Sequence, residues 1–219
     1  MKVIELHRSI TESNDKDALA LSRELKEKGI FFINLMSAAG SGKTTLLSKT
    51  IVDLKDQYNI AVVEADIEAD VDAKTIEALG ATSIQVHTDG MCHMDAGMTR
   101  TGLKEMGLHN IDIAFLENVG NLICPAEYAT GASKNVMILS VPEGDDKPLK
   151  YPLMFKVSDV LLITKIDTIS YFDFDMDKCI ERVIYLNPDI KIFPVSAKTG
   201  EGMDKWEQWL VQETKEWKK

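Results

Sequence analysis

Residues 31–44 read FFINLMSAAGSGKT, an apolar run that leads into a glycine-rich loop ending in Lys43 and Thr44. Segment 37–44 matches the phosphate-loop pattern G-x-x-x-x-G-K-S/T except at its first position, where Ser37 stands in place of glycine. The helix-compatible stretch TTLLSKTIVDLKDQY follows. Because strand, loop and helix come in the order that the motif requires, the sequence predicts a loop that binds the phosphates of a nucleotide.

Each residue type in this loop has a physical role. Gly40 and Gly42 allow the backbone to wrap around an anion, and the N-terminus of the following helix adds partial positive charge. Lys43 can reach the β- and γ-phosphates, and the Thr44 hydroxyl can bind Mg²⁺. Ser37 lacks the conformational freedom of glycine, so we expect it to constrain the turn. The expected nucleotide contacts in the loop are Ala39, Gly40, Ser41, Gly42, Lys43, Thr44 and Thr45. The alternative is a glycine-rich turn that binds nothing.

Outside the loop, short β-rich runs alternate with helix-like segments. The expected strands are 31–36, 60–66, 83–87, 111–118, 135–141, 159–164 and 191–196, and the expected helices are 43–57, 71–79, 95–106, 174–187 and 203–217. Runs such as IAVVEA and VLLIT are apolar almost throughout, as in parallel sheets with helices on both faces. The predicted fold class is therefore α/β with a doubly wound, mainly parallel sheet, whose ligands bind at the carboxyl ends of the strands.

An amphipathic helix is expected at about 14–28, before the first strand. Ser13 or Asn14 would cap its N-terminus, and Gly29 would stop it. The apolar side of this helix is expected to consist of Leu19, Leu21 and Leu25. The chain length of 219 residues fits a single domain over 1–219 that includes this helix.

The strand-like run DVLLIT leads into Thr164, Lys165 and Asp167, which resemble the N/T-K-x-D signature of GTP-binding proteins. The Asp167 carboxylate can accept hydrogen bonds from N1–H and the 2-amino group of guanine, a donor pair that adenine lacks. Lys165 can lay its stem along the base. Thr164 replaces the commoner asparagine, so we expect the loss of an amide that helps to hold the neighbouring loops.

A second segment supports guanine as the base. Ser196, Ala197 and Lys198 resemble the SAK loop, which donates a backbone N–H to the guanine oxygen. A chance match is the alternative for either segment alone, but both occur downstream of the phosphate loop. We therefore expect GTP or GDP as the nucleotide.

Two strand-like runs deliver acids to their carboxyl ends. IAVVEAD ends in Asp66, and IDIAFLEN carries Glu117. Together with Thr44, these acids are candidate Mg²⁺ ligands, and with Lys43 they are the candidate catalytic residues. A strand-end acid that caps the next helix is the alternative. Since neither an arginine finger nor a water-positioning glutamine is evident, we expect slow turnover without a partner.

The soft donors Cys92, His93 and Cys124 suggest a second metal site, for zinc or nickel rather than magnesium. Three ligands do not close a tetrahedral site, and adjacent side chains in a regular strand do not converge on one ion. Either this segment is a loop, or two chains share the site. The alternative is a buried cysteine and an incidental Cys-His pair. Cys179 lies in a helix-like segment and is expected to be a small buried residue.

Composition excludes several other classes of protein. The 25 Lys and Arg residues against 35 Asp and Glu give a formal charge of −10, without the basic block that a nucleic-acid surface needs. Neither a signal peptide nor a run of about 18 apolar residues is present, so we expect a cytoplasmic protein that does not contact membranes. Three cysteines do not suggest a disulfide framework.

The set GSGKTTLL, GMCHMDA, ENVGNLICPAEY, SVPEGDDKPLKYPLMF, TKID and VSAKTGEGMDKW resembles the HypB family, the hydrogenase nickel-incorporation GTPases. The resemblance runs from about residue 15 to the C-terminus and is most specific in ENVGN-x-x-CPA and EGDDKPLKYP. It implies a P-loop GTPase fold of the metallochaperone type. It also implies a GTPase that dimerises on binding GTP or metal and delivers nickel to the large subunit of NiFe hydrogenase, with a small zinc-containing chaperone as partner.

In that family Cys92, His93 and Cys124 match the metal-binding positions, which implies a nickel or zinc site at a dimer interface. The Cys- and His-rich N-terminal extensions of some members are missing, so we expect no storage role. Two alternatives stay open. One is an accessory GTPase for another nickel enzyme such as urease, although no Cys-Pro-His motif occurs here. The other is a metal-storing nucleotide-binding module without significant turnover.

Overall fold

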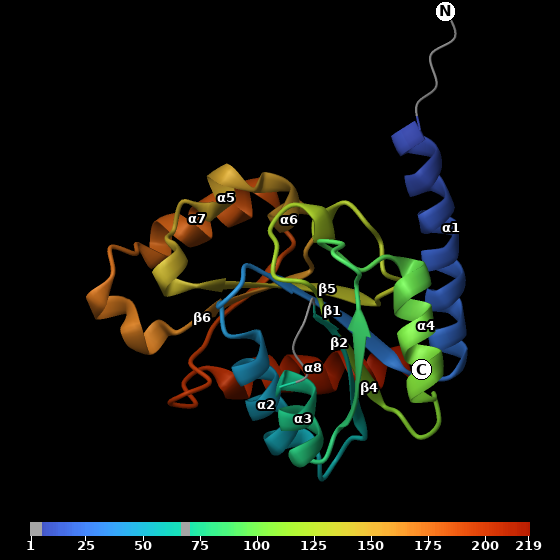
Figure 1. The fold of residues 1–219 in the computed structure, drawn as a ribbon. Helices are drawn as coiled ribbons and strands as arrows, with labels where there is room; N and C mark the ends of the chain where they lie inside the picture. Colours follow the sequence, from blue (N-terminus) through green and yellow to red (C-terminus); the bar gives the residue numbers. More distant parts are fainter. Residues whose placement is uncertain (1–5, 67–70) are drawn as a thin grey trace, which may run out of the picture.

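The strands form one parallel sheet with helices on both faces (Figure 1). The computed structural model describes residues 6–66 and 71–219. Within these residues the sheet has seven strands in the order β3-β2-β4-β1-β5-β6-β7, and each pairing is parallel. The strands are β1 (Phe31–Ser37), β2 (Ile60–Asp66), β3 (Thr82–His87), β4 (Ile113–Glu117), β5 (Lys134–Ser140), β6 (Val160–Thr164) and β7 (Lys191–Pro194). The predicted doubly wound α/β fold is confirmed.

The helices form a layer on each face of the sheet. They are α1 (Leu6–Glu27), α2 (Lys43–Leu54), α3 (Val71–Ala78), α4 (Ala96–Met106), α5 (Lys147–Lys150), α6 (Pro152–Lys156), α7 (Met176–Leu186) and α8 (Met203–Trp217), with 3-10 turns η1 (Cys124–Ala126), η2 (Val141–Glu143) and η3 (Ile166–Tyr171). One layer contains α2, α3 and α8; the other contains α1, α4, α6 and α7 (Figure 1). Among the described residues, no helix combines the length and apolar character needed to cross a membrane.

Alternate residues of each strand face opposite layers. In the central strand β1, Ile33 and Leu35 pack with the α2–α3–α8 layer, whereas Phe32 packs with α1 and α4. All seven residues of this strand are buried. Burial on both faces explains why the strands read as continuous apolar runs. Because β1 lies between β4 and β5, the loops after β1 and β4 meet at one edge of the sheet.

Helix α1 begins at Leu6, so neither Ser13 nor Asn14 is its N-cap, and this prediction is wrong. The buried Asn14 side chain instead donates to the Ala129 carbonyl (2.9 Å) and accepts from the Ala96 N–H (2.9 Å). It connects α1 to α4, and the two helices lie side by side in Figure 1. The predicted stop at Gly29 is confirmed by its φ of +68°.

The apolar side of α1 was predicted only in part. Leu21 and Leu25 are buried, but Leu19 is 59% exposed, and Ala18 occupies the buried position beside them. The sequence also did not predict α5 and α6. These helices have four and five residues and contain Pro148 and Pro152, so they are too short to show a helical period.

Candidate nucleotide and metal sites

The phosphate loop connects the end of β1 to the start of α2. Its positive φ angles fall at Gly40 (+73°) and Gly42 (+98°), where glycine costs no strain. Ser37 is buried as the last residue of β1 and has no positive φ, so the predicted constraint on the turn is wrong. Its hydroxyl instead accepts a hydrogen bond from Lys43 Nζ (2.9 Å) and donates to the Ala38 carbonyl (2.8 Å).

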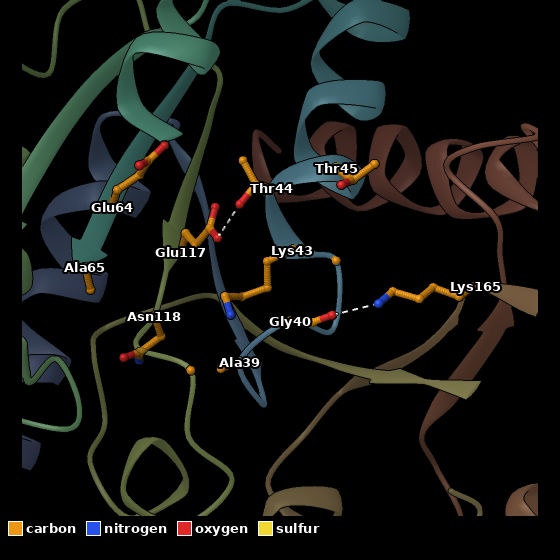
Figure 2. Close-up of a pocket in the computed structure, with 12 residues that line it drawn as sticks. Ala39, Gly40, Lys43, Thr44, Thr45, Glu64, Ala65, Glu117, Asn118 and Lys165 are labelled. Atoms are coloured by element: carbon orange, nitrogen blue, oxygen red, sulfur yellow. Dashed lines mark hydrogen bonds between the residues drawn. The ribbon is translucent and has the colours of Figure 1, made fainter. Parts of the chain in front are cut away.

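A cleft of about 500 Å³ opens at the N-terminus of α2 (Figure 2). It is lined by Ala39, Gly40, Gly42, Lys43, Thr44, Thr45, Glu64, Ala65, Glu117, Asn118, Gly120 and Lys165. The helix N-terminus and the Lys43 ammonium supply positive charge at one side of the cleft, where phosphate groups bind favourably. Carboxylates from β2 and β4 line the other side.

A second cavity, of about 230 Å³, lies next to this cleft and shares Gly42, Thr45 and Lys165 with it. Its lining residues are Ser41, Gly42, Thr45, Leu46, Thr164, Lys165, Asp167, Thr168, Ser196, Ala197 and Lys198. Ser196 Oγ donates to Asp167 Oδ1 (2.7 Å), which fixes the carboxylate against the SAK loop. Every residue expected to contact the nucleotide therefore lines one of two adjacent cavities, a polar one and a more enclosed one suited to a base.

Two residues of the TKID segment hold the phosphate loop in place. Thr164 Oγ1 donates to the Ser41 carbonyl (2.8 Å), and Lys165 Nζ donates to the Gly40 carbonyl (2.7 Å, Figure 2). The amide that an asparagine would supply is absent, as expected, but the Thr164 hydroxyl makes a contact between the loops in its place. Lys165 has a φ of +60°, an uncommon conformation for a residue with a side chain, which aims its stem across the loop.

Glu117, the last residue of β4, accepts a hydrogen bond from Thr44 Oγ1 at Oε1 (3.0 Å, Figure 2). A hydroxyl and a carboxylate side by side are the oxygen donors that Mg²⁺ prefers. β2 ends at Asp66, but the Asp66 side chain lies outside the described residues. Its expected role as a magnesium ligand therefore stays a prediction.

Glu64 is the acid that the sequence analysis missed. It is 3% exposed and lines the same cleft, and its Cα is paired in register with that of Glu117. In these strands Ile60, Val62 and Phe115 pack with the α2 layer, and side-chain alternation puts both glutamates on that face. The signal was present in IAVVEAD: an acid two residues before the strand end, with the parity of the apolar residues that face α2.

The chain brings Cys92, His93 and Cys124 together (Cys124 opens η1). Their ligand atoms all lie within 4.8 Å of one another, with Cys92 Sγ 2.8 Å from Cys124 Sγ and 3.9 Å from His93 Nδ1. Residues 92 and 93 belong to a loop, where adjacent side chains can converge on one ion, as the first of the two predicted arrangements requires. A site shared by two chains stays a prediction. Two thiols and an imidazole suit zinc or nickel by their softness.

The surroundings of the cluster favour metal binding. The His93 ring is buried and stacked on Tyr128, with 3.9 Å between centroids and 17° between planes. Burial lowers the pKa of His93, outweighing the charges of Asp95 and Glu127, so the imidazole is neutral near pH 7 and its nitrogen is available. The hydrogen bond with Cys92, more than burial, raises the pKa of Cys124, which acts against metal binding because the ligand is the thiolate. Cys92 is exposed, so an ion can enter from solvent.

Cys179 is fully buried in α7, as predicted. Burial raises the pKa of its thiol to about 12, with a smaller contribution from the charge of Asp145. A thiol of this kind is neither a metal ligand nor a nucleophile at neutral pH.

Comparisons with known proteins show which family the chain belongs to. The family model described as CobW/HypB/UreG, nucleotide-binding domain, matches residues 31–194. Hydrogenase maturation factor HypB from Escherichia coli K12 is 42% identical over 209 residues, which cover 95% of this chain and 72% of that protein. Hydrogenase/urease maturation factor HypB from Helicobacter pylori J99 is 37% identical over 219 residues, covering 98% and 90%.

A solved structure of HypB from Helicobacter pylori in complex with nickel superposes with a TM-score of 0.87 at 37% identity, covering 93% of this chain and 96% of that one. The match therefore extends over nearly the whole chain. The chain belongs to the HypB family of hydrogenase maturation factors, P-loop GTPases within the CobW/HypB/UreG group.

Proposed function

We propose that this chain is a cytoplasmic GTP-hydrolysing metallochaperone that assists nickel insertion into the large subunit of NiFe hydrogenase. The observation that carries the proposal is the short segment from Glu117 to Cys124. At one end Glu117 contacts Thr44 of the phosphate loop, and at the other Cys124 joins the soft-donor cluster. One piece of backbone thus belongs to a nucleotide cleft and to a metal cluster.

In the nucleotide half, GTP would occupy both cavities. Asp167 would accept from the guanine edge, backbone N–H groups of 39–45 would donate to the phosphates, and Lys43 would neutralise charge on the β- and γ-phosphates. The oxygen donors of Thr44 and Glu117 fit Mg²⁺, and Asp66 or Glu64 would complete or orient its water shell. When bound, Mg²⁺ supplies charge neutralisation to the phosphates.

Turnover is proposed to be slow without a partner. The described side chains that line the cleft supply two lysines, Lys43 and Lys165, and two carboxylates, but neither arginine nor glutamine. Carboxylates hold magnesium and order water, whereas large rate increases in GTP hydrolysis come from a cation placed on the transferring phosphate. A partner that supplies such a cation would raise the rate.

In the metal half, Ni²⁺ or Zn²⁺ would bind Cys92, His93 and Cys124, and a second copy of the chain would complete the coordination. Three donors are one short of a tetrahedral zinc site, and the open side of the cluster faces solvent. Exposed apolar side chains flank both cysteines, Met91 at 42% and Ile123 at 55% exposure. Such a rim favours contact with another protein, either a second copy, a small zinc-containing chaperone or the hydrogenase subunit.

GTP would control the metal through the shared segment. A nucleotide changes metal affinity only if the two nucleotide states hold the cluster differently. In the GTP form Glu117 would contact Mg²⁺, and without Mg²⁺ it would return to its hydrogen bond with Thr44. These two positions of Glu117 would make the metal affinity of the two nucleotide states differ.

The test combines size-exclusion chromatography and metal analysis, with GDP or a non-hydrolysable GTP analogue. We expect about one metal ion per site, a shift to dimer with metal or analogue, and loss of both metal and metal-induced dimer in Cys92→Ala. Cys179→Ala is the matched control, since its thiol is buried in α7. Metal retained by Cys92→Ala would contradict the site, and equal metal affinity with the two nucleotides would contradict the control by GTP.

A second client enzyme is a further possibility, because the Helicobacter pylori relative is named a hydrogenase/urease maturation factor. Deletion of the gene distinguishes the two, since the enzyme that loses activity and regains it with added nickel is the client. Phosphate release with and without Mg²⁺ separates a GTPase from a metal-storing module that never turns over.

A further inference from the structure

Asn118 directly follows Glu117 and is almost fully buried, with 1% of its surface exposed. Its side-chain oxygen Oδ1 accepts two hydrogen bonds, from the backbone N–H of Met94 (3.1 Å) and from its neighbour Val119 (2.9 Å). Its Nδ2 donates to Oδ1 of Asn34 in β1 (3.0 Å). Met94 is fully buried and follows the metal-cluster residue His93 in the chain. Asn118 therefore contacts the backbone of the loop after β3 that carries Cys92, His93 and Met94, here called the metal loop. It also lines the nucleotide cleft.

The donors and acceptors at the two ends of a hydrogen-bond chain fix which way the Asn118 amide faces. Backbone N–H groups only donate, so the oxygen of Asn118 must face Met94. At the other end, Asn34 Nδ2 donates to Asn135 Oδ1 (3.1 Å), and Asn135 Nδ2 donates to the Val157 carbonyl (3.2 Å), which only accepts. Three amides, at the end of β4 (Asn118) and in the strands β1 (Asn34) and β5 (Asn135), thus form one directional chain of hydrogen bonds. A flip of any amide would oppose two donors or two acceptors.

The metal loop has a second tie to the same segment. Asn121 Nδ2 donates to the Cys92 carbonyl (3.4 Å), and Cys124 lies three residues further along. The bond from Asn121 to Cys92 is exposed to solvent, where water replaces such a contact readily, whereas the Asn118 bond to Met94 is buried. The buried bond is the stronger restraint on where His93 sits.

We infer that Asn118 is the positioning residue that transmits the nucleotide state from the end of β4 to the metal cluster. The inference rests on the proposed function. A shift of Glu117 toward Mg²⁺ moves the adjacent peptide, and Asn118 passes that movement to Met94 and so to His93. The contact with Met94 carries this movement, and it does not involve Asn34.

The test measures the ratio of nickel dissociation constants in the GDP and GTP-analogue forms, both saturated with nucleotide and titrated against a chromophoric chelator. For the wild type we expect a ratio of about 5 to about 150, the usual size of such coupling. In Asn118→Ala the ratio should fall to within about twofold of one. The matched control is Asn34→Ala, which removes a buried amide of the same chain but leaves the contact with Met94, and it should keep the wild-type ratio.

The outcomes separate the two ideas. A wild-type ratio of one contradicts the control by GTP before any variant is made. A wild-type ratio above one that persists in folded Asn118→Ala, or that disappears equally in Asn34→Ala, overturns the role of Asn118 alone. If Asn118→Ala does not fold, hydrogen exchange of the wild-type protein decides, because protection of the Met94 amide must differ between the GDP and analogue forms. Equal protection overturns the inference.

Discussion

Gly120 is the point at which the segment after β4 comes closest to the phosphate loop. A Cβ placed on it would lie 2.9 Å from both the Cα and the N of Ala39, and 3.2 Å from its Cβ. Ordinary contacts of a Cβ begin at 3.4 Å, so alanine would be about 0.5 Å too close. Gly120 has no positive φ, and the cost of Gly120→Ala is therefore one of packing rather than of backbone conformation.

The magnitude follows from which atoms have to move. The clash is with the main chain of the phosphate loop, which cannot rotate away as a side chain would, and overpacking of this kind costs about 1–3 kcal/mol. The loop must regain its native geometry to bind phosphate. If the whole cost is expressed there, GDP and GTP bind about 5-fold to about 150-fold more weakly.

The assay compares nucleotide dissociation constants, from a fluorescent guanine nucleotide, with the free energy of unfolding in urea. Gly102→Ala is the matched control: its Cβ would lie 2.8 Å from Val86 Cγ2 and 3.0 Å from Val63 Cγ1, on the side of the sheet covered by α4. The Gly102→Ala protein should have a lower free energy of unfolding but the same nucleotide dissociation constants as the wild type. A Gly120→Ala protein that binds GDP as tightly as the wild type would refute the close approach of the two segments.

Three further predictions concern single side chains. Thr164→Val removes the hydroxyl bonded to the phosphate loop and should weaken GDP binding by about 1 kcal/mol in isothermal titration, whereas Thr164→Ser should retain most of the affinity. Burial, with a hydrogen bond that protonated Glu207 donates to Asp53, raises the pKa of Glu207 from 4.5 to about 7. Because the folded state binds the proton more tightly than the unfolded state, the free energy of unfolding should fall as pH rises from about 4.5 to about 7. In thermal melts, Glu207→Gln should lack this part of the pH dependence. Cys179, with a pKa of about 12, should resist iodoacetamide in the folded protein and react only on unfolding, which mass spectrometry of the labelled peptide would show.

The phosphate loop and the base pocket were predictable because their chemistry is local. The glycines, Lys43 and Thr44 are contiguous, and so are Thr164, Lys165 and Asp167, so that each motif contains its own geometry. The apolar strands predicted a parallel sheet, and the sheet brings the carboxyl ends together. Contiguous motifs at the carboxyl ends of neighbouring parallel strands are thus expected to lie side by side, as the two cavities that share Lys165 do.

The metal cluster could be proposed but not assembled from the sequence. Cys92 and Cys124 are 32 residues apart, and their separation in space depends on the loops after β3 and β4 rather than on any periodic pattern. A buried hydrogen bond of Asn118 and a solvent-exposed hydrogen bond of Asn121 tie these loops together. Contacts of this type need coordinates, because asparagines in loops have many possible partners. Asn14 was misassigned for the same reason, since a cap and a tertiary tie use the same side chain.

Register explains why the end of β4 can take part in two sites. Ile113 and Phe115 pack with the α2 layer, and Ala114 and Leu116 with the α1–α4 layer. The alternation places Glu117 with the phosphate loop and Asn118 with the metal loop. A slip of one residue would reverse the faces, turning the amide toward the layer that contains α2 and the carboxylate toward the layer that contains α1 and α4. The order of the apolar residues in β4 therefore decides on which side of the sheet the acid and the amide lie.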